Sequence, residues 1–139
     1  MAKTMVYNLP SVVNWASNVI GGAERFPEDS PCIGLLEDGK LVGAVVYTMY
    51  TGTGVMMSVA SSNRRWLNRP FLRAAFSYPF KQLGCRRVSG LVRVDNKDAQ
   101  RFDEHLGFKR EGLLRSADYD GEDLIMYGML KDECKWINI

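Results

Sequence analysis

Apolar residues recur along this chain with two different spacings, and the spacing separates predicted helices from predicted strands. Spacings of three to four residues predict helices over residues 11–20, 69–84 and 97–107. Short runs rich in β-branched and other apolar residues predict strands over 4–9, 32–36, 40–50, 55–61, 86–94, 108–117 and 123–130. Residues 23–31 are predicted to form a loop or a short helical turn.

Capping and breaking residues predict where the helices begin and end. Ser11 is the predicted N-cap of the first helix, and glycines 21–22 are predicted to end it. Pro70 suits the first turn of the second helix, whereas Pro79 is predicted to end or kink it. Gly107 is predicted to end the third helix.

The order of these elements predicts an α/β (α+β) fold with a single mixed sheet. The strands over 32–61 are joined by short turns and are predicted to form an antiparallel meander. After residue 55, strands and helices alternate, which predicts parallel neighbours in the sheet. We therefore expect one domain over residues 1–139, with about seven strands and helices on both faces.

The composition is that of a folded domain, with 46% hydrophobic and 24% charged residues. No apolar run approaches the ~20 residues of a membrane-spanning helix, and residues 1–15 lack the continuous apolar core of a signal peptide. Three scattered cysteines and one histidine argue against a zinc site, so no metal is expected. We expect reduced thiols in a cytoplasmic protein with no membrane partner.

Arginines cluster at 64, 65, 69 and 73, although the net charge is only +2. This cluster indicates either an anionic partner or an ordinary solvated basic surface. Nucleic-acid binding through the arginines, Trp66 and Tyr78 would give a steep salt dependence, but the small net charge argues against it.

The second half of the chain carries a recognisable combination of residues: Asn96 after Val-Arg-Val, Ala99, Leu-Gly-Phe at 106–108, and Glu-Gly at 111–112. Together with the segment at 37–47 and the closing strands, this combination resembles the GCN5-related N-acetyltransferases. The similarity covers roughly residues 31–131 and is greatest to the branch that acetylates ribosomal-protein N-termini and small amines. Small, divergent relatives of this kind look like proteins carried by tailed phages.

The resemblance implies that acetyl passes from acetyl-CoA to a primary amine by direct attack, without a covalent enzyme intermediate. The amine would belong to a protein N-terminus, a lysine or a small molecule. The implied cofactor-binding residues are Ser58, Val59, Ala60, Arg64, Arg65, Trp66, Leu67, Asn68, Arg69 and Asn96. Asn96 is equally suited to capping the helix that follows it.

The chain departs from the family pattern where the pyrophosphate is bound. Trp66 and Asn68 replace the two glycines of the family's loop, and Asn68 is the substitute that best tolerates left-handed backbone angles. One interpretation is that Arg64, Arg65 and Arg69 replace the lost main-chain contacts, which we favour because they cluster at a helix N-terminus. The other is that the site has decayed.

Proton transfer is a second departure. The family's tyrosine, seven residues after the asparagine, is here Asp103, which we expect to be a surface residue. Weak catalytic candidates are Ser58, Glu111, Tyr119 and Asp123, each with an ordinary structural interpretation too. A catalytically inactive protein of the same fold that binds a protein partner is the alternative. The apolar end of the chain, residues 131–139, is predicted to pack on the domain or on a second subunit, as in a homodimer.

Overall fold

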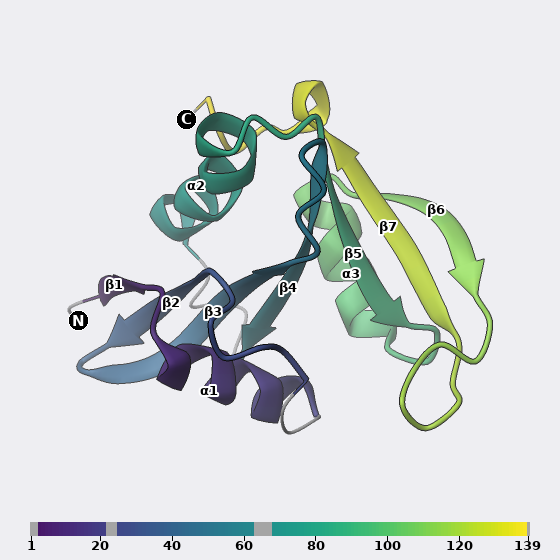
Figure 1. Ribbon diagram of the computed structural model, residues 1–139, viewed down its shortest axis with the longest axis horizontal. Helices are drawn as coiled ribbons and strands as arrows, with labels where there is room; N and C mark the ends of the chain where they lie inside the picture. Colours follow the sequence, from purple (N-terminus) through teal and green to yellow (C-terminus); the bar gives the residue numbers. More distant parts are fainter. Residues whose placement is uncertain (1–2, 22–24, 63–67, 139) are drawn as a thin grey trace.

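The computed structural model describes residues 3–21, 25–62 and 68–138. In chain order (Figure 1) its elements are β1 (Lys3–Tyr7), α1 (Pro10–Ile20), β2 (Cys32–Glu37), β3 (Lys40–Thr48), β4 (Gly54–Ser61), α2 (Arg69–Ser77), η2 (Tyr78–Gln82), β5 (Arg87–Arg93), α3 (Lys97–Leu106), β6 (Lys109–Leu114), β7 (Leu124–Leu130) and η3 (Lys131–Glu133).

The described strands form one seven-stranded sheet in the order β1-β2-β3-β4-β5-β7-β6, which confirms the predicted mixed sheet. Only β4 and β5 pair in parallel; the other neighbours are antiparallel. The prediction of parallel neighbours is therefore right for β4 and β5 but wrong for β5 and β6, because β7 lies between them. In β7, Ile125, Tyr127 and Met129 are fully buried, whereas every residue of β6 is exposed. The more apolar strand takes the inner place in the sheet.

Helix α1 covers one face of the sheet, across β2, β3 and β4. Its residues Val12, Val13 and Ala16 pack in a buried cluster with Cys32, Ala44, Val46 and Ala60. Gly34 of β2 permits this close packing, because a Cβ atom there would lie 2.9 Å from a methyl carbon of Val12. A helix this close to the sheet requires a residue without a side chain beneath it.

Helices α2 and α3 lie over the opposite face and share one core. The rings of Phe76 in α2 and Phe108 after α3 have centroids 6.0 Å apart. The segment after η3 packs on this core: Trp136 is buried, and its indole N–H donates to the Leu106 carbonyl at 2.8 Å. Helices thus cover both faces, as predicted, and the apolar segment 134–137 packs on its own domain.

The structure corrects one predicted helix end and confirms others. Helix α1 begins at Pro10 with Leu9 as its N-cap, so the prediction of Ser11 as the cap is wrong. Pro10 favours the earlier start, because its fixed φ suits a first helical turn and it has no N–H to satisfy. Gly21 and Gly107 end α1 and α3 with positive φ angles of 104° and 114°, as predicted.

Pro79 changes the second helix as the sequence predicts. Helix α2 ends at Ser77, and residues 78–82 form a π-helical turn that contains Pro79. The Leu83 N–H donates to the Tyr78 carbonyl at 3.0 Å, five residues back. Proline lacks the N–H that a continued α-helix would need, and the wider turn accommodates this.

The three cysteines are buried thiols without disulfide bonds. Within residues 3–21, 25–62 and 68–138, no cluster of histidine, cysteine and acidic side chains has the makings of a metal site. The helices of the same residues are too short or too polar for any of them to span a bilayer.

Candidate functional site

The two parallel strands at the centre of the sheet pair over only part of their length. Residues 54–56 of β4 pair with residues 87–89 of β5, but β4 continues to Ser61 and β5 to Arg93. Figure 1 shows the two strands diverging toward their carboxyl ends. We call residues 57–61 of β4 and 90–93 of β5 the splay. It exposes strand backbone at the centre of the sheet rather than at its edge.

Successive residues of β4 direct their backbone N–H and C=O groups to opposite sides of the strand, and this determines which groups point into the splay. The Ser62 N–H donates to the Val42 carbonyl at 3.2 Å, so alternate residues back from Ser62, including Ala60 and Ser58, bond to β3. The residues between them, among them Val59, direct N–H and C=O groups toward β5. In agreement, the carbonyl oxygen of Met57 lies 3.6 Å from where a Cβ atom on Gly90 would be.

Helix α2 begins after the carboxyl end of β4, with Asn68 as its N-cap. The Asn68 side-chain oxygen accepts a hydrogen bond from the Phe71 N–H at 2.8 Å. Its φ of −95° and ψ of 170° are extended, so Asn68 does not use the left-handed angles that asparagine tolerates. An N-cap residue adopts extended angles so that its side chain can reach the first turn. Arg69 is exposed in that turn, and Arg64, Arg65, Trp66 and Leu67 lie outside the described residues.

Helix α3 begins after the carboxyl end of β5, with Asn96 as its N-cap. The Asn96 side-chain oxygen accepts from the Ala99 N–H at 3.1 Å, so the capping interpretation is correct. Its role toward a cofactor stays a prediction. Buried Gln100 fastens the helix to β5 by donating to the carbonyls of Arg93 and Val94 at 3.1 and 3.0 Å. The helical pattern did not reveal that Gln100 is buried, since a glutamine beside an apolar stripe is normally predicted to face solvent.

Asp103 of α3 lies over the splay. It is half-buried, so the expectation of a surface residue is wrong. One of its carboxylate oxygens is 3.8 Å from where a Cβ atom on Gly90 would be. A Cβ atom at position 90 would make only ordinary van der Waals contact with this carboxylate, so the carboxylate lies directly over this part of β5. Only the packing of α3 on β5 reveals this contact.

Buried Tyr127 stands beside Gly90 in the register of β5 and β7. Its hydroxyl donates to a carboxylate oxygen of Glu104 at 2.7 Å. Burial, and then this bond to a carboxylate, raise the pKa of Tyr127 to about 12. The α3 side of the splay thus holds a neutral phenol near two acidic side chains, Asp103 and Glu104.

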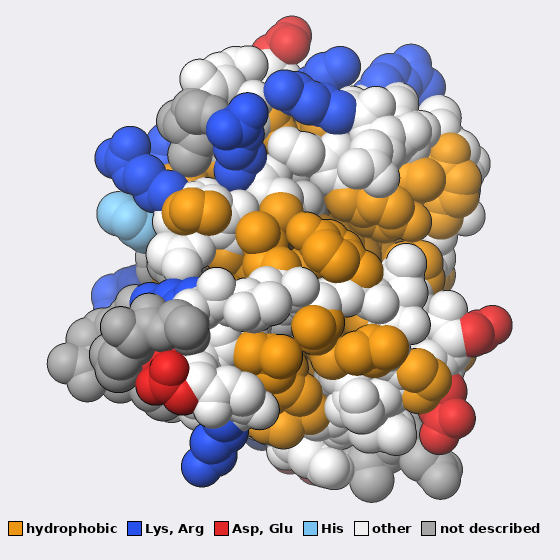
Figure 2. Space-filling view, turned by 90° about the vertical axis from the view of Figure 1, so that its left-hand side faces the viewer, with side chains coloured by type: hydrophobic (Ala, Val, Ile, Leu, Met, Phe, Trp, Pro, Cys, Tyr) orange, Lys and Arg blue, Asp and Glu red, His pale blue; other side chains and the backbone are white. Residues whose placement is uncertain are grey.

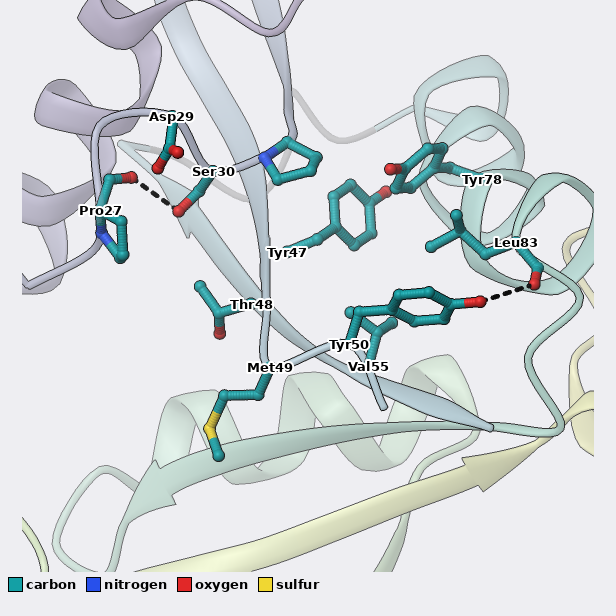
Figure 3. A pocket seen from close by; sticks show the side chains of 11 residues that line it. Pro27, Asp29, Ser30, Tyr47, Thr48, Met49, Tyr50, Val55, Tyr78 and Leu83 are labelled. Carbon is teal, nitrogen blue, oxygen red and sulfur yellow. Dashed lines mark hydrogen bonds between the residues drawn. The ribbon is translucent and has the colours of Figure 1, made fainter. Parts of the chain in front are cut away.

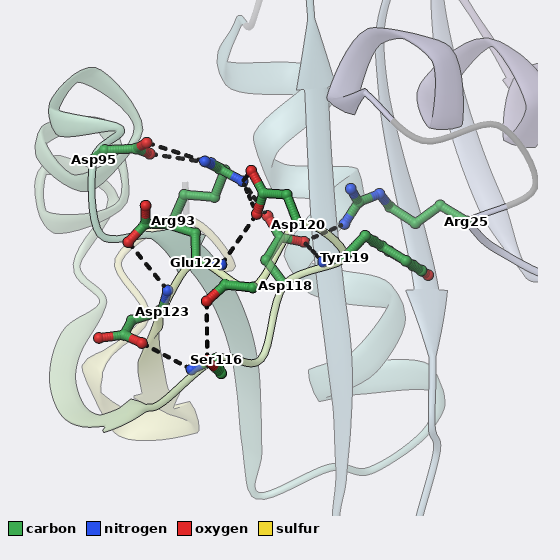
Figure 4. A network of polar contacts seen from close by, with 10 residues as sticks. Arg25, Arg93, Asp95, Ser116, Asp118, Tyr119, Asp120, Glu122 and Asp123 are labelled. Atoms are coloured by element: carbon green, nitrogen blue, oxygen red, sulfur yellow. Dashed lines mark hydrogen bonds and ion pairs between the residues drawn. The ribbon is translucent and has the colours of Figure 1, made fainter.

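On the α1 side, Arg93 at the end of β5 gathers three carboxylates (Figure 4). Its guanidinium bonds Asp118 at 2.7 Å, Asp120 at 2.9 Å and Asp95 at 3.0 Å. These bonds hold the pKa values of Asp95 and Asp120 below their usual range. Burial alone would raise the pKa of Asp118, but bonds from Arg93 and the Tyr119 N–H outweigh it and lower that pKa as well.

Arg25, in the segment after α1, contacts the β6–β7 loop. Its guanidinium is 3.6 Å from a carboxylate oxygen of Asp118 and 4.7 Å from the centroid of the Tyr119 ring. Figure 4 shows the two segments meeting through these side chains. We call this contact the Arg25 bridge. It joins one half of the sheet to the other on the face where α1 lies.

The weak catalytic candidates occupy different places. Ser58 lies on β4 two residues before buried Ala60, so the two side chains share one face of the strand. Ala60 packs against α1, so the Ser58 side chain lies on the α1 side. Tyr119 is 78% exposed in the Arg25 bridge, and Asp123 accepts from the Ser116 N–H at 2.8 Å in the same loop. Glu111 pairs with Arg87 at 2.6 Å, near the paired end of β4 and β5. The structure therefore does not gather these four candidates at one point.

Comparison with known proteins identifies the fold. No protein-family model matches the chain. An uncharacterized N-acetyltransferase of Methanocaldococcus jannaschii is 30% identical over 101 residues, which are 70% of this chain and 65% of that relative. A variant of spermidine N-acetyltransferase SpeG from Vibrio cholerae superposes with a TM-score of 0.74 at 15% identity, covering 97% of this chain and 98% of that one.

Two further solved structures agree. Ard1 from Thermoplasma volcanium has a TM-score of 0.69 at 18% identity and covers 94% and 98% of the two chains. A GNAT-family acetyltransferase from Bacillus anthracis has a TM-score of 0.61 at 19% identity, with 91% and 89% covered. The chain has the GNAT fold.

The described part of the splay fits the amide-bearing arm of acetyl-CoA, because Val59 presents strand N–H and C=O groups toward β5, and α2 begins just beyond.

Proposed function

We propose that the protein is an acetyl-CoA-dependent N-acetyltransferase that acts on a primary amine. The observation that carries this proposal is the splay of β4 and β5, with the Val59 N–H directed into it. The amine would belong to a protein N-terminus, a lysine or a small molecule. The similarity to a spermidine N-acetyltransferase supports the small-amine class.

The chain's own residues would bind and orient acetyl-CoA, which supplies the acetyl group as an activated thioester. The Val59 N–H, which is directed into the splay, would polarise a carbonyl that lies there, in the manner of an oxyanion hole. Ser58 and Ala60 hold Val59 in place through their pairing with β3. Asn68 and Arg69 lie at the N-terminus of α2, where an anion is favoured, and Arg64 and Arg65 would add charge there. Asn96 would approach from the start of α3.

Direct attack requires a neutral amine and a proton for the leaving thiolate. Asp103 lies next to the splay, 3.8 Å from the position of a Cβ atom on Gly90, and we assign it to the transfer of this proton. Glu111 pairs with Arg87 near the paired end of β4 and β5, away from the splay, and is not assigned this role. Ser58 and Tyr119 lie on the α1 side, with Ser58 on the splay strand itself, whereas Asp123 bonds within its own loop. Holding the reactants together contributes about 7–11 kcal/mol, so a site with a single carboxylate is chemically sufficient.

The acceptor would approach on the α1 side, past the Arg25 bridge. Among the described side chains there, the carboxylates of Asp95, Asp118 and Asp120 outnumber the guanidinium groups of Arg25 and Arg93. A field of this sign attracts a protonated amine and raises its local concentration.

The decisive experiment is isothermal titration with acetyl-CoA, using dephospho-CoA and ATP as controls, followed by thiol release with a panel of amines. We expect micromolar binding that is selective for acetyl-CoA. Arg64→Ala/Arg65→Ala should abolish this binding, and Arg73→Ala, an exposed arginine further along α2, should not. An absence of binding at millimolar acetyl-CoA would overturn the proposal. Recovery of a protein partner in a pull-down would then support a catalytically inactive GNAT-fold protein.

A further inference from the structure

A cavity of about 310 Å³ lies away from the splay, beside the C-terminal end of α2 (Figure 3). Its walls come from residues 27–31, the end of β3 with the turn that follows, the first residues of β4, and the turn after α2. A second cavity of about 260 Å³ adjoins it and shares Pro31, Tyr47 and Tyr78. No residue of the splay lines either cavity, so this space is separate from the proposed transfer site.

Three tyrosine rings shape the cavity. Tyr47 and Tyr78 form an inclined pair with ring centroids 4.8 Å apart, and Tyr50 lies across from them in Figure 3. The Tyr47 hydroxyl donates to the Ala75 carbonyl, and the Tyr50 hydroxyl donates to the Leu83 carbonyl at 3.4 Å. These bonds to α2 and its following turn orient two of the rings. Burial raises the pKa values of Tyr47 and Tyr78, so both stay uncharged.

The charge of the lining is negative. Asp29 is the single ionisable carboxylate among the described lining residues of the larger cavity, and neither lysine nor arginine lines it. Figure 2, viewed from the side of β1, shows hydrophobic side chains in a band across this face, with most of the blue lysine and arginine side chains outside the band. An anion such as a phosphate or a carboxylate would find no counter-charge among the described lining residues.

We propose that this cavity binds a small organic ammonium ion. Aromatic rings attract a cation through their negative faces, and tyrosine cages are suited to alkylammonium groups that are too weakly hydrated to prefer water. Asp29 supplies the counter-charge, and the apolar side chains of Pro31, Val55 and Leu83 accept the alkyl part. This inference stands without the proposed acetyl transfer, because it concerns binding at a different place.

The test is titration of the full chain with tetramethylammonium chloride, followed by NMR signals of the Met49 methyl group and the Tyr50 ring. Sodium chloride at equal ionic strength and uncharged tert-butanol, of similar size, are the controls. We expect saturable shifts with tetramethylammonium alone. Tyr50→Leu, which removes an exposed ring, and Asp29→Asn should each weaken binding ~10-fold, whereas Tyr50→Phe, which keeps the ring, should weaken it less than ~2-fold.

Three outcomes would overturn the proposal. One is equal binding of tert-butanol, which would mean that the cavity selects shape and not charge. Another is an absence of saturable shifts at millimolar tetramethylammonium. The third is that the shifts appear at Val59 and Gly90 instead of Met49 and Tyr50, which would place the cation in the splay. Binding of acetyl-CoA is measured separately, so failure here leaves the proposed function untouched.

Discussion

Arg87 of β5 reaches Glu111 of β6 across the strand between them, with 2.6 Å from guanidinium nitrogen to carboxylate oxygen. The pair passes over Gly128 of β7. A Cβ atom at Gly128 would lie 2.4 Å from both side chains, so glycine is what lets the pair cross. Arg87 and Glu111 thereby connect three strands at the paired end of β4 and β5.

Gly128→Ala should break this pair and lower the free energy of unfolding by about 1 kcal/mol. Both side chains are roughly one-third exposed, and such partly exposed pairs contribute ~0–1 kcal/mol. Urea denaturation measures the change. Gly112→Ala is the matched control, because a Cβ atom there meets nothing within 4 Å. If Gly128→Ala were as stable as the natural protein, the crossing over β7 would have no energetic role.

Val59→Pro should reduce acetyl transfer ~100-fold, the usual loss when one oxyanion donor is removed. Proline deletes the N–H that faces the splay but leaves the bonds of Ser58 and Ala60 to β3. Thiol release under saturating acetyl-CoA measures the rate, and circular dichroism checks the fold. Ser58→Pro should instead destabilise the protein, since it removes a bond between β3 and β4. Full activity of a folded Val59→Pro variant would exclude this N–H from the chemistry.

Alkaline pH should destabilise the protein partly through Tyr127. The folded protein raises the pKa of Tyr127 from 10 to about 12, so this contribution is complete below pH ~10 and is lost as pH rises toward 12. The loss should be of order 2 kcal/mol. Urea denaturation at pH 8 and pH 11 measures it against Tyr127→Phe, in which this part of the dependence disappears. Glu104→Gln should diminish this part of the pH dependence. An unchanged pH dependence in both variants would contradict its assignment to Tyr127.

Arg93→Gln should destabilise the protein at pH 7, because it leaves buried Asp118 with fewer partners. The pKa values of Asp95, Asp118 and Asp120 are lowered, so their contribution is present above pH ~4 and is lost as pH falls below it. The variant should therefore lose less stability on acidification than the natural protein. Thermal denaturation at pH 7 and pH 3 tests both statements.

Arg101→Gln provides the control for Arg93, since its ion pair with Asp98 is fully on the surface. Its effect should stay within ±0.5 kcal/mol at either pH. An Arg93 variant that matched the Arg101 variant would show that the carboxylate cluster does not contribute to stability.

Asp103→Asn should lower the acetyl-transfer rate ~100-fold, if Asp103 moves the reacting proton. Its binding of acetyl-CoA should change little. Initial rates under saturating acetyl-CoA measure the change. Asp98→Asn, on the exposed first turn of the same helix, is the control and should keep the natural rate. A folded Asp103→Asn variant with the natural rate would reduce Asp103 to a packing residue over Gly90.

The sequence by itself determined the elements and most of their ends. Helices follow from apolar spacing, and Gly21, Gly107, Pro79 and Asn96 act on neighbours within one turn, so their effects are visible in a short window of sequence. The mixed sheet follows from the order of the elements. The resemblance to the N-acetyltransferases rested on a similarly local combination of residues around α3.

Only the tertiary structure decided which distant residues meet. It placed β7 between β5 and β6, brought Asp103 over Gly90, and buried Asp118 against Arg93 and Arg25. It also formed the tyrosine-lined cavity from the loop before β2, the end of β3 with its following turn, the start of β4 and the turn after α2. These contacts depend on strand register and on burial across the whole core, and a pattern of neighbouring residues carries no information about either.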